Sequence, residues 1–225
     1  MTQTPQPPSI YQLRLVLSKI SPMVWRRFLV ASETSLAQLH AYIQIIFSWS
    51  DEHLHRFRIQ GKDYGIAHQG GISFSDNPHA VTLSDFRLHP RERFRYEYDF
   101  TAGWQIEIRL DKILPMKLDC RVPVCSGGRG AAPGEGYAGP LAYLQHLDRH
   151  RYEFPFEALE KMAAVIQRWL NSEGDCRAVD DLAELREAVE HVSAYQAFRP
   201  HRFNRREVNR KLLEASFIGD HGAVV

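Results

Sequence analysis

Apolar and polar residues alternate strictly in an early stretch of the chain. Every second position between residues 11 and 17 is apolar, which predicts a strand with one buried face. These positions are Tyr11, Leu13, Leu15 and Leu17. Ser21-Pro22 then marks a turn, and residues 23–30 form a second β-prone run. We therefore expect the fold to begin with a β-hairpin.

The periodicity changes to that of a helix after residue 34. Ser35 followed by Gln38 is a capping-box signal, because each residue can bond the other's backbone N–H group. Apolar residues then recur at helical spacing, at Leu36, Leu39, Ile43 and Phe47. The pattern predicts a helix over residues 35–47 that lays this stripe on the sheet. Gln44 lies outside the stripe and is expected to contribute little to stability.

A further strand is expected over residues 53–59, with a short one around Tyr64 in a glycine-bearing loop over 61–71. The clearest β pattern is a hairpin with arms at 94–100 and 104–110. Its tightest register would pair Glu97 with Glu107 and Arg95 with Arg109. Because like charges directly opposite each other are unfavourable, a bulge or a shifted register is expected.

The last third of the chain is predicted to be helical after a long connection. Residues 126–140 contain six glycines and two prolines, which indicates a loop without regular structure. Helices are expected over 141–147, 156–170, 179–192 and 204–215, with Asn204 capping the last one. No internal repeat is visible.

These elements predict an α+β fold. We expect a twisted, mostly antiparallel or mixed sheet of about five strands, packed by one main helix and followed by a C-terminal helical layer. The order of the elements also permits a β-grasp-like topology. Residues 1–9 are expected to be a disordered tail, 10–214 one domain with an added helical segment at 150–195, and 215–225 a C-terminal tail.

Composition narrows the class of protein. The chain has 225 residues, of which 44% are hydrophobic and 24% charged, as in an ordinary globular protein. The apolar runs are too short for a membrane span, and the first nine residues lack the pattern of a secretory signal. The three cysteines, Cys120, Cys125 and Cys176, are too few for a disulfide framework. We therefore expect a soluble, cytoplasmic protein with reduced thiols and no membrane partner.

Charge is balanced overall but uneven locally. The net charge is +1, so composition does not indicate a nucleic-acid-binding protein. Residues 173–190 are acidic, whereas residues 199–211 are basic and include Arg205 and Arg206. Two neighbouring solvated helices that pair their faces explain this better than a nucleic-acid surface.

Several short motifs combine across most of the chain. They include Tyr11-x-Leu13-x-Leu15, Ser21-Pro22-x-x-Trp25-Arg26-Arg27, Phe47-x-Trp49, His53-Leu54-His55-x-Phe57, Tyr96-x-Tyr98-Asp99-Phe100 and Phe198-x-Pro200-x-x-Phe203 with Val208-Asn209-x-x-Leu212. In this combination the sequence resembles the Ri-plasmid open-reading-frame-three-like family, whose members are also described as passenger proteins of insertion sequences. The match spans about residues 10 to 214. The resemblance implies an α+β fold and no established activity.

The sequence departs from the family at the hairpin turn and in the glycine-rich loop. Where the family has an acidic residue and a histidine around Trp104, this chain has Ala102 and Ile106. The loop over 131–137 retains Glu135 but neither of the family's cysteines. The resemblance therefore implies that any polar chemistry of typical members is altered here.

Two histidines are the best candidates for chemistry. His53 and His55, two apart on an expected strand, would project from one face and could share a metal. His40, Asp51 and Glu52 are near in sequence, but no third ligand has a recognisable spacing. We favour hydrogen-bonded histidines over a metal site. Arginines in Trp25-Arg26-Arg27 and at 91–95 are expected on outer strand faces.

The sequence favours a non-catalytic binding or accessory module linked to mobile elements, with a protein partner and no cofactor or metal. The first alternative is a metal-binding protein or enzyme with a site near His53, His55, Asp99 and Glu135. The second alternative is nucleic-acid binding through the basic C-terminal helix. The candidate binding residues are His53, His55, Asp99, Trp104, Glu135, Arg205 and Arg206, and no catalytic residue is assigned.

Overall fold

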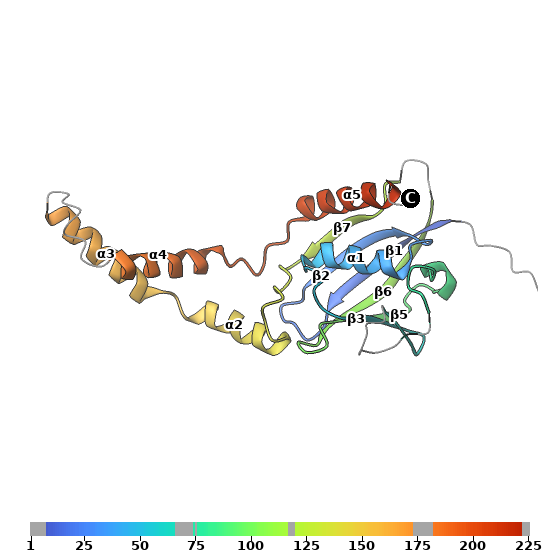
Figure 1. The fold of residues 1–225 in the computed structure, drawn as a ribbon, viewed down its shortest axis with the longest axis horizontal. Coiled ribbons are helices and arrows are strands. Elements are labelled where there is room, and N and C mark those ends of the chain that lie inside the picture. The colour runs from blue at the N-terminus through green and yellow to red at the C-terminus, as the bar shows by residue number, and fades with distance from the viewer. Residues whose placement is uncertain (1–7, 66–73, 75, 117–119, 173–181, 222–225) are drawn as a thin grey trace, which may run out of the picture. The chain divides into compact units, whose positions relative to one another are not determined.

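The computed structural model describes residues 8–65, 74, 76–116, 120–172 and 182–221. Two compact units emerge, the first from Met1–Leu144 with His201–Val225 and the second from Gln145–Pro200. The first holds the sheet, helix α1 (Leu36–Phe47) and helix α5 (Arg205–His221) (Figure 1). Within the described ranges no helix is long and apolar enough to cross a membrane. Parts of the loop expected at 61–71, of the acidic run at 173–190 and of both expected tails lie outside the described residues.

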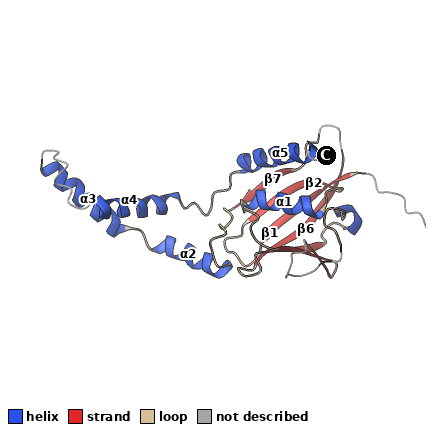
Figure 2. Ribbon diagram, viewed as in Figure 1, coloured by secondary structure: helices blue, strands red, loops and turns tan. Residues whose placement is uncertain are grey.

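The described strands form one antiparallel seven-stranded sheet in the order β4-β3-β5-β6-β1-β2-β7 (Figure 2). The strands are β1 (Ser9–Leu17), β2 (Trp25–Ala31), β3 (His55–Ile59), β4 (Lys62–Tyr64), β5 (Arg93–Tyr98), β6 (Trp104–Pro115) and β7 (Val124–Arg129). A short 3-10 helix covers Leu83–Phe86. The α+β class and the opening hairpin are confirmed, but the expected number of about five strands is too low.

Alternation puts the apolar side chains of the strands on one face of the sheet. Leu13 and Leu15 of β1 and Ile106 and Ile108 of β6 are fully buried on this face, where helix α1 packs. The expected stripe of α1 is confirmed, because Leu36, Leu39, Ile43 and Phe47 are all buried. The capping box is also present, with Ser35 and Gln38 bonding each other's backbone N–H groups.

The hairpin of β5 and β6 has a shifted register. Arg95 lies opposite Glu107 and Glu97 lies opposite Gln105, so the glutamate pair of the tightest register is avoided. The turn between the strands spans five residues, from Asp99 to Gly103, and the Gly103 N–H group donates to the Asp99 carbonyl. The wider turn moves the pairing by two positions, which pairs Arg95 with Glu107 but puts Arg93 opposite Arg109.

Strand β7 occupies the beginning of a stretch that was expected to be a loop. Gly127 and Gly128 pair with Arg27 and Arg26 of β2, so the glycines belong to an edge strand. Asn209 of α5 completes this edge, because its side-chain amide donates to the Cys125 carbonyl and accepts from the Cys125 N–H group. Helix α5 is thereby fixed over β7, and Asn204 caps it as expected.

The second unit is helical. It contains most of α2 (Pro140–Tyr152), together with α3 (Phe156–Asn171) and α4 (Leu182–Ala197). The His150 ring stacks on Tyr195 with 4.1 Å between ring centroids, and Lys161 forms an ion pair with Glu184 at 3.1 Å. Glu184 of α4 is thus paired within its own unit.

Candidate functional site

Polar side chains converge beneath the C-terminal half of α1. His40 and Gln44 are one helical turn apart and both face the sheet, where Tyr96 of β5 lies between them. His55 comes from the start of β3, and Asp51 comes from the loop that follows α1. We call His40, Gln44, Asp51, His55 and Tyr96 the histidine cluster.

The loop after α1 turns sharply, which brings Asp51 back to the helix. Ser48 ends α1 in a left-handed conformation, and Asp51 itself has a φ of 64°. Short polar residues tolerate this conformation better than β-branched ones. As a result, the Asp51 N–H group donates to Gln44 Oε1 at 3.2 Å, and the Asp51 carboxylate lies 2.6 Å from His40 Nε2.

The hydrogen bonds of the histidine cluster together determine which group donates and which accepts in each bond. Gln44 Oε1 accepts from the Asp51 backbone, so Gln44 Nε2 is free to donate to the Tyr96 hydroxyl at 2.8 Å. The Tyr96 hydroxyl then donates to His40 Nδ1 at 2.7 Å, and His40 carries its proton on Nε2, facing Asp51. The chain of hydrogen bonds therefore selects one tautomer of a neutral imidazole.

Burial favours the uncharged forms of His40 and Tyr96. His40 is 5% exposed, and burial lowers its pKa although the neighbouring Asp51 carboxylate acts in the opposite direction. Burial likewise raises the pKa of Tyr96 well above its ordinary value. At neutral pH the interior of the cluster thus offers an imidazole and a phenol in their neutral forms.

The second imidazole lies directly against the first. The rings of His40 and His55 are stacked, with 3.5 Å between centroids and 7° between planes. His40, Asp51 and His55 each offer one ligand atom, and these three atoms all lie within 4.8 Å of one another. Two imidazole nitrogens and a carboxylate oxygen are a donor set that transition metals bind.

A second set of polar contacts joins the glycine-rich loop to the same side of the sheet. The Tyr98 hydroxyl donates to one oxygen of Glu135, and the other oxygen accepts from the Ser50 N–H group at 2.7 Å. Trp49 stacks on Tyr98 and donates to the Pro133 carbonyl. Burial, followed by the hydrogen bond to Glu135, raises the pKa of Tyr98. Glu135 thus anchors the loop over the cluster.

The other residues proposed from the sequence have distinct environments. His53 precedes β3 rather than lying on it, so the expected common strand face of His53 and His55 is wrong. His53 lies 3.9 Å from the Asp99 carboxylate, while Asp99 accepts from the Thr101 and Ala102 N–H groups and stabilises the hairpin turn. Trp104 is fully buried, and its Nε1 has no partner among the described residues.

Arg205 and Arg206 lie apart from this cluster, on helix α5. Arg205 donates to the Ser126 carbonyl, and both side chains are on the exposed side of the helix. Further along α5, Arg210 and Lys211 are paired with Glu214 and Glu207 of the same helix. The basic C-terminal stretch is therefore partly neutralised by its own glutamates.

His40 and Asp51 were weighed from the sequence only as neighbours, and Gln44 and Tyr96 were not assigned to a site. The available signal was the spacing of His40 and Gln44, which puts two polar side chains on the apolar face of α1. Polar residues on a buried helix face require partners, which sequence alone could not identify.

The fold and cluster define an α+β protein built on one antiparallel sheet, with a histidine and a tyrosine buried under its main helix and bonded to an exposed aspartate. The chain belongs to the plasmid pRiA4b ORF-3-like family, whose model matches residues 9–207. It is 26% identical over 187 residues to the uncharacterized protein y4hQ of Sinorhizobium fredii, covering 83% of this chain and 93% of that protein.

A solved structure has the same fold. The crystal structure of MM3350, a protein of unknown function from Methanosarcina mazei Go1, matches with a TM-score of 0.60 and 26% identity. The match covers 90% of this chain and 98% of the other. The family match and the solved structure confirm the family and the fold, and the names of the two relatives state no activity.

Proposed function

We propose that the protein binds a divalent transition-metal ion, with His40, Asp51 and His55 as its ligands. The observation that carries the proposal is the convergence of three donor atoms from α1, the following loop and β3 within 4.8 Å. The proposal adopts the metal-binding alternative, whose expected site was near His53, His55, Asp99 and Glu135. It assigns the ligands instead to His40, Asp51 and His55. His55 is common to both sets.

The chemistry of the donors favours zinc or a similar ion over magnesium or calcium. Imidazole nitrogens suit zinc, nickel and copper, whereas magnesium and calcium prefer all-oxygen sites. Asp51 has a side chain that is 56% exposed, so an ion and its remaining water ligand can reach the cluster from solvent. Tyr96 and Gln44 stand behind His40 as the hydrogen-bonded support that metal-ligating histidines have.

Metal binding would require two local changes. Two nitrogens about 2.1 Å from a zinc ion in a tetrahedral site are roughly 3.4 Å apart, with their lone pairs pointing at the ion. Parallel stacked imidazoles direct their lone pairs side by side, so one ring must tilt out of the stack. For His40 to coordinate through Nε2, its proton must instead be carried on Nδ1. That N–H group would then donate to the Tyr96 oxygen, whose own hydrogen would turn away from the ring.

The test is zinc binding by the full-length chain, measured by calorimetry at neutral pH and by elemental analysis after purification without chelator. We expect one ion per chain in the wild type and at least roughly tenfold weaker binding in Asp51→Asn and His55→Ala. Asp51→Asn preserves shape and is exposed, so it should leave the fold intact.

His53→Ala is the matched control, because it removes an imidazole two positions from His55 that lies outside the donor set. It should bind zinc like the wild type. Absence of zinc binding in the wild type, or equal binding in His55→Ala and the wild type, would contradict the proposal. Equal loss in His53→Ala and His55→Ala would move the site toward Asp99.

The association with mobile elements is a separate hypothesis. Its support is the family description, which names a plasmid open reading frame. A marked insertion sequence that transposes at the same frequency with and without the gene would argue against it.

We also assign the protein to the cytoplasm, because a sparse set of cysteines suits a reducing compartment.

A further inference from the structure

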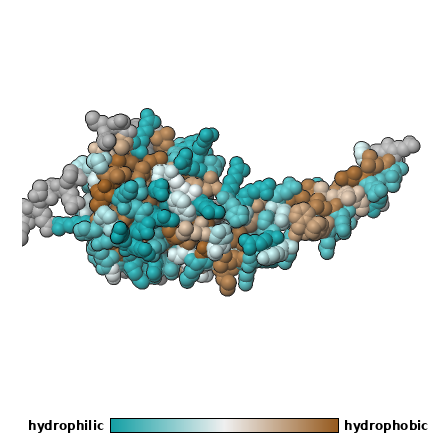
Figure 3. Space-filling model, turned by 180° about the vertical axis from the view of Figure 1, so that it is seen from behind, coloured by the Kyte–Doolittle hydropathy of each residue, from teal (hydrophilic) through white to brown (hydrophobic). Residues whose placement is uncertain are grey.

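Four arginines form a row across four neighbouring strands. Arg93 of β5 lies opposite Arg109 of β6, Arg109 lies opposite Arg14 of β1, and Arg14 lies opposite Arg27 of β2. Alternation puts all four on the face of the sheet away from α1. Seen from that side, the surface of the sheet unit is mainly hydrophilic (Figure 3). We call Arg93, Arg109, Arg14 and Arg27 the arginine row.

Like charges directly opposite one another destabilise a sheet, and the arginine row contains three such pairs in succession. Nothing in the packing of the core requires arginine there, because these side chains lie on the outer face and are not fully buried. An arrangement that opposes folding on an open face is typical of a surface that meets a ligand of opposite charge.

Counter-ions are distributed unevenly over this face. Toward β3 and β4 the arginines are neutralised, because Arg56 pairs with Glu97 and Arg58 pairs with Asp63. Within the row, Arg93 pairs with Glu107 and Arg109 with Asp111. By contrast, Arg14 and Arg27 have no acidic partner among the described residues. Unpaired positive charge therefore lies over β1 and β2.

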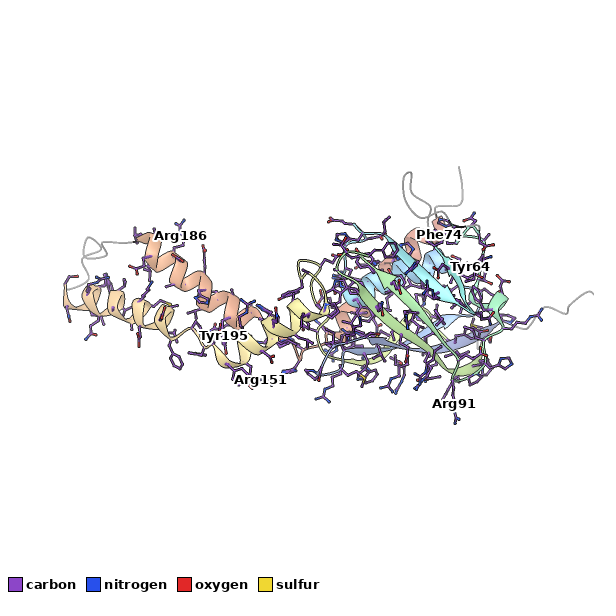
Figure 4. The ribbon with its side chains drawn as sticks, turned by 90° about the horizontal axis from the view of Figure 1, so that it is seen from below. Tyr64, Phe74, Arg91, Arg151, Arg186 and Tyr195 are labelled. Carbon is purple, nitrogen blue, oxygen red and sulfur yellow. The ribbon has the colours of Figure 1, made fainter. Side chains whose placement is uncertain are left out.

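A hollow with a volume of about 490 Å³ lies along the row. Arg27, Arg91, Arg93, Arg109 and Lys112 line it, with Asp111 as the one acidic side chain and Gln12 as a neutral one. Arg91 is exposed, and its side chain projects away from the body of the unit (Figure 4). Arg93 and Arg109 are ion-paired, and the remaining cations Arg27, Arg91 and Lys112 make this hollow a site for negatively charged groups.

Trp25 holds the two unpaired arginines in place. The Arg14 guanidinium lies 4.9 Å from the centre of a Trp25 ring, and the Arg27 guanidinium lies 5.8 Å from it. Stacked in this way, the guanidiniums lose less freedom on binding than mobile side chains would. The site is thus partly organised before a ligand arrives.

The geometry points to the phosphate backbone of a single-stranded nucleic acid as the ligand of the arginine row. Four side chains on adjacent strands span roughly 14 Å, since strands lie about 4.8 Å apart. That length exceeds one phosphate and accommodates several successive ones along a strand. A single strand can follow an open sheet face closely, and a positively charged groove is how proteins bind it without sequence preference.

This surface differs from both sites considered above. It lies on the opposite face of the sheet from the histidine cluster, so the two proposals stand or fall separately. It also differs from the basic C-terminal helix, where Arg210 and Lys211 pair with glutamates of the same helix.

The test is fluorescence anisotropy of a labelled oligothymidylate with the full-length chain, starting at about 50 mM salt. We expect Arg14→Gln with Arg27→Gln to weaken binding at least roughly tenfold and to reduce the slope of log K against log salt by about 1.4. The same variant should be at least as stable as the wild type in urea, because two like-charge pairs disappear.

Two further variants make the result specific. Arg205→Gln with Arg206→Gln removes the same charge from α5 and should leave binding unchanged. Arg14→Lys with Arg27→Lys retains the charge and should preserve most of the binding. Unchanged affinity in the glutamine variant of the row, or loss in the α5 variant, would overturn the assignment. Binding of inorganic polyphosphate without binding of the oligonucleotide would overturn the choice of ligand.

Discussion

Arg26 is a fully buried arginine without a carboxylate partner among the described residues. It is 1% exposed, and burial lowers its pKa to about 10. Its Nη1 donates to the Trp25 and Arg129 carbonyls, and its guanidinium lies between the Phe203 ring at 3.8 Å and the Phe47 ring at 5.4 Å. The expectation that this arginine lies on an outer strand face is wrong, because Arg26 faces α1.

We predict that Arg26→Lys destabilises the protein by about 2 to 3 kcal/mol. Lysine retains the buried charge but cannot stack as a plane between two rings. The measurement is the free energy of unfolding in urea. Arg27→Lys, the next residue on the outer face, is the control and should change stability by less than about 0.5 kcal/mol. Equal effects at both positions would show that the stacking of Arg26 contributes nothing.

The sequence could predict which residues are buried by local periodicity, but not which residues meet through tertiary contacts. The periodicity of α1 identified Leu39 and Ile43 as core, and both are fully buried. Gln44 was expected to matter little, yet it is 4% exposed and bonded to Tyr96 and Asp51. Its main partner lies 52 positions away on another element. No local pattern contains that information.

At the scale of elements, the edge strand β7 shows why the number of strands expected from the sequence was too low. Gly127 and Gly128 indicate a loop by composition, whereas the structure pairs both with β2 and packs Gly128 closely. A Cβ atom added at Gly128 would lie 2.6 Å from the Phe203 ring and 2.8 Å from the Arg26 side chain. Glycine within a strand often marks such a close approach. Periodicity predicted the strands whose alternation is regular.

Two side chains of α5 bond the backbone of β7, Arg205 at the Ser126 carbonyl and Asn209 at Cys125, and Asn209 makes the larger number of bonds. Asn209 makes two hydrogen bonds to the backbone of Cys125, at 2.8 and 3.1 Å. We predict that Asn209→Ala lowers the free energy of unfolding by about 1 to 3 kcal/mol, because two backbone groups lose their partner.

The control for this prediction is Arg206→Ala, on the exposed side of the same helix. It removes a side chain of α5 without affecting the edge of β7. Hydrogen exchange should show faster exchange of the Cys125 amide in Asn209→Ala alone. A protected Cys125 amide in that variant would contradict the role assigned to Asn209.

At the scale of the whole molecule, the sheet separates two kinds of chemistry. Apart from Arg26, its inner face carries neutral polar groups that are hydrogen-bonded to one another, and its outer face carries the arginine row. Inner-face groups contribute to stability in their uncharged forms, whereas outer-face groups are charged at every physiological pH. The pH dependence of stability therefore reports on the inner face.

Buried tyrosines dominate that dependence above neutrality. Burial raises the pKa of Tyr96, Tyr98 and Tyr143, in the case of Tyr143 to about 12. The unfolded chain ionises these phenols near pH 10, before the folded chain does, so it releases protons first. Their contribution to stability is complete below pH 10 and is lost as the pH rises through the folded-state pKa values.

We therefore predict that the free energy of unfolding decreases steadily above about pH 10, with phenolate absorbance appearing together with unfolding. Urea melts between about pH 8 and 11 measure it. Tyr98→Phe should make the decrease shallower, since one raised pKa is removed, although it also breaks the bond to Glu135 and lowers stability at pH 8. Tyr152→Phe, at a side chain that is 77% exposed, should leave the dependence unchanged. Stability that stays level through this range, with phenolate forming in the folded protein, would mean that the tyrosines of the inner face are open to solvent.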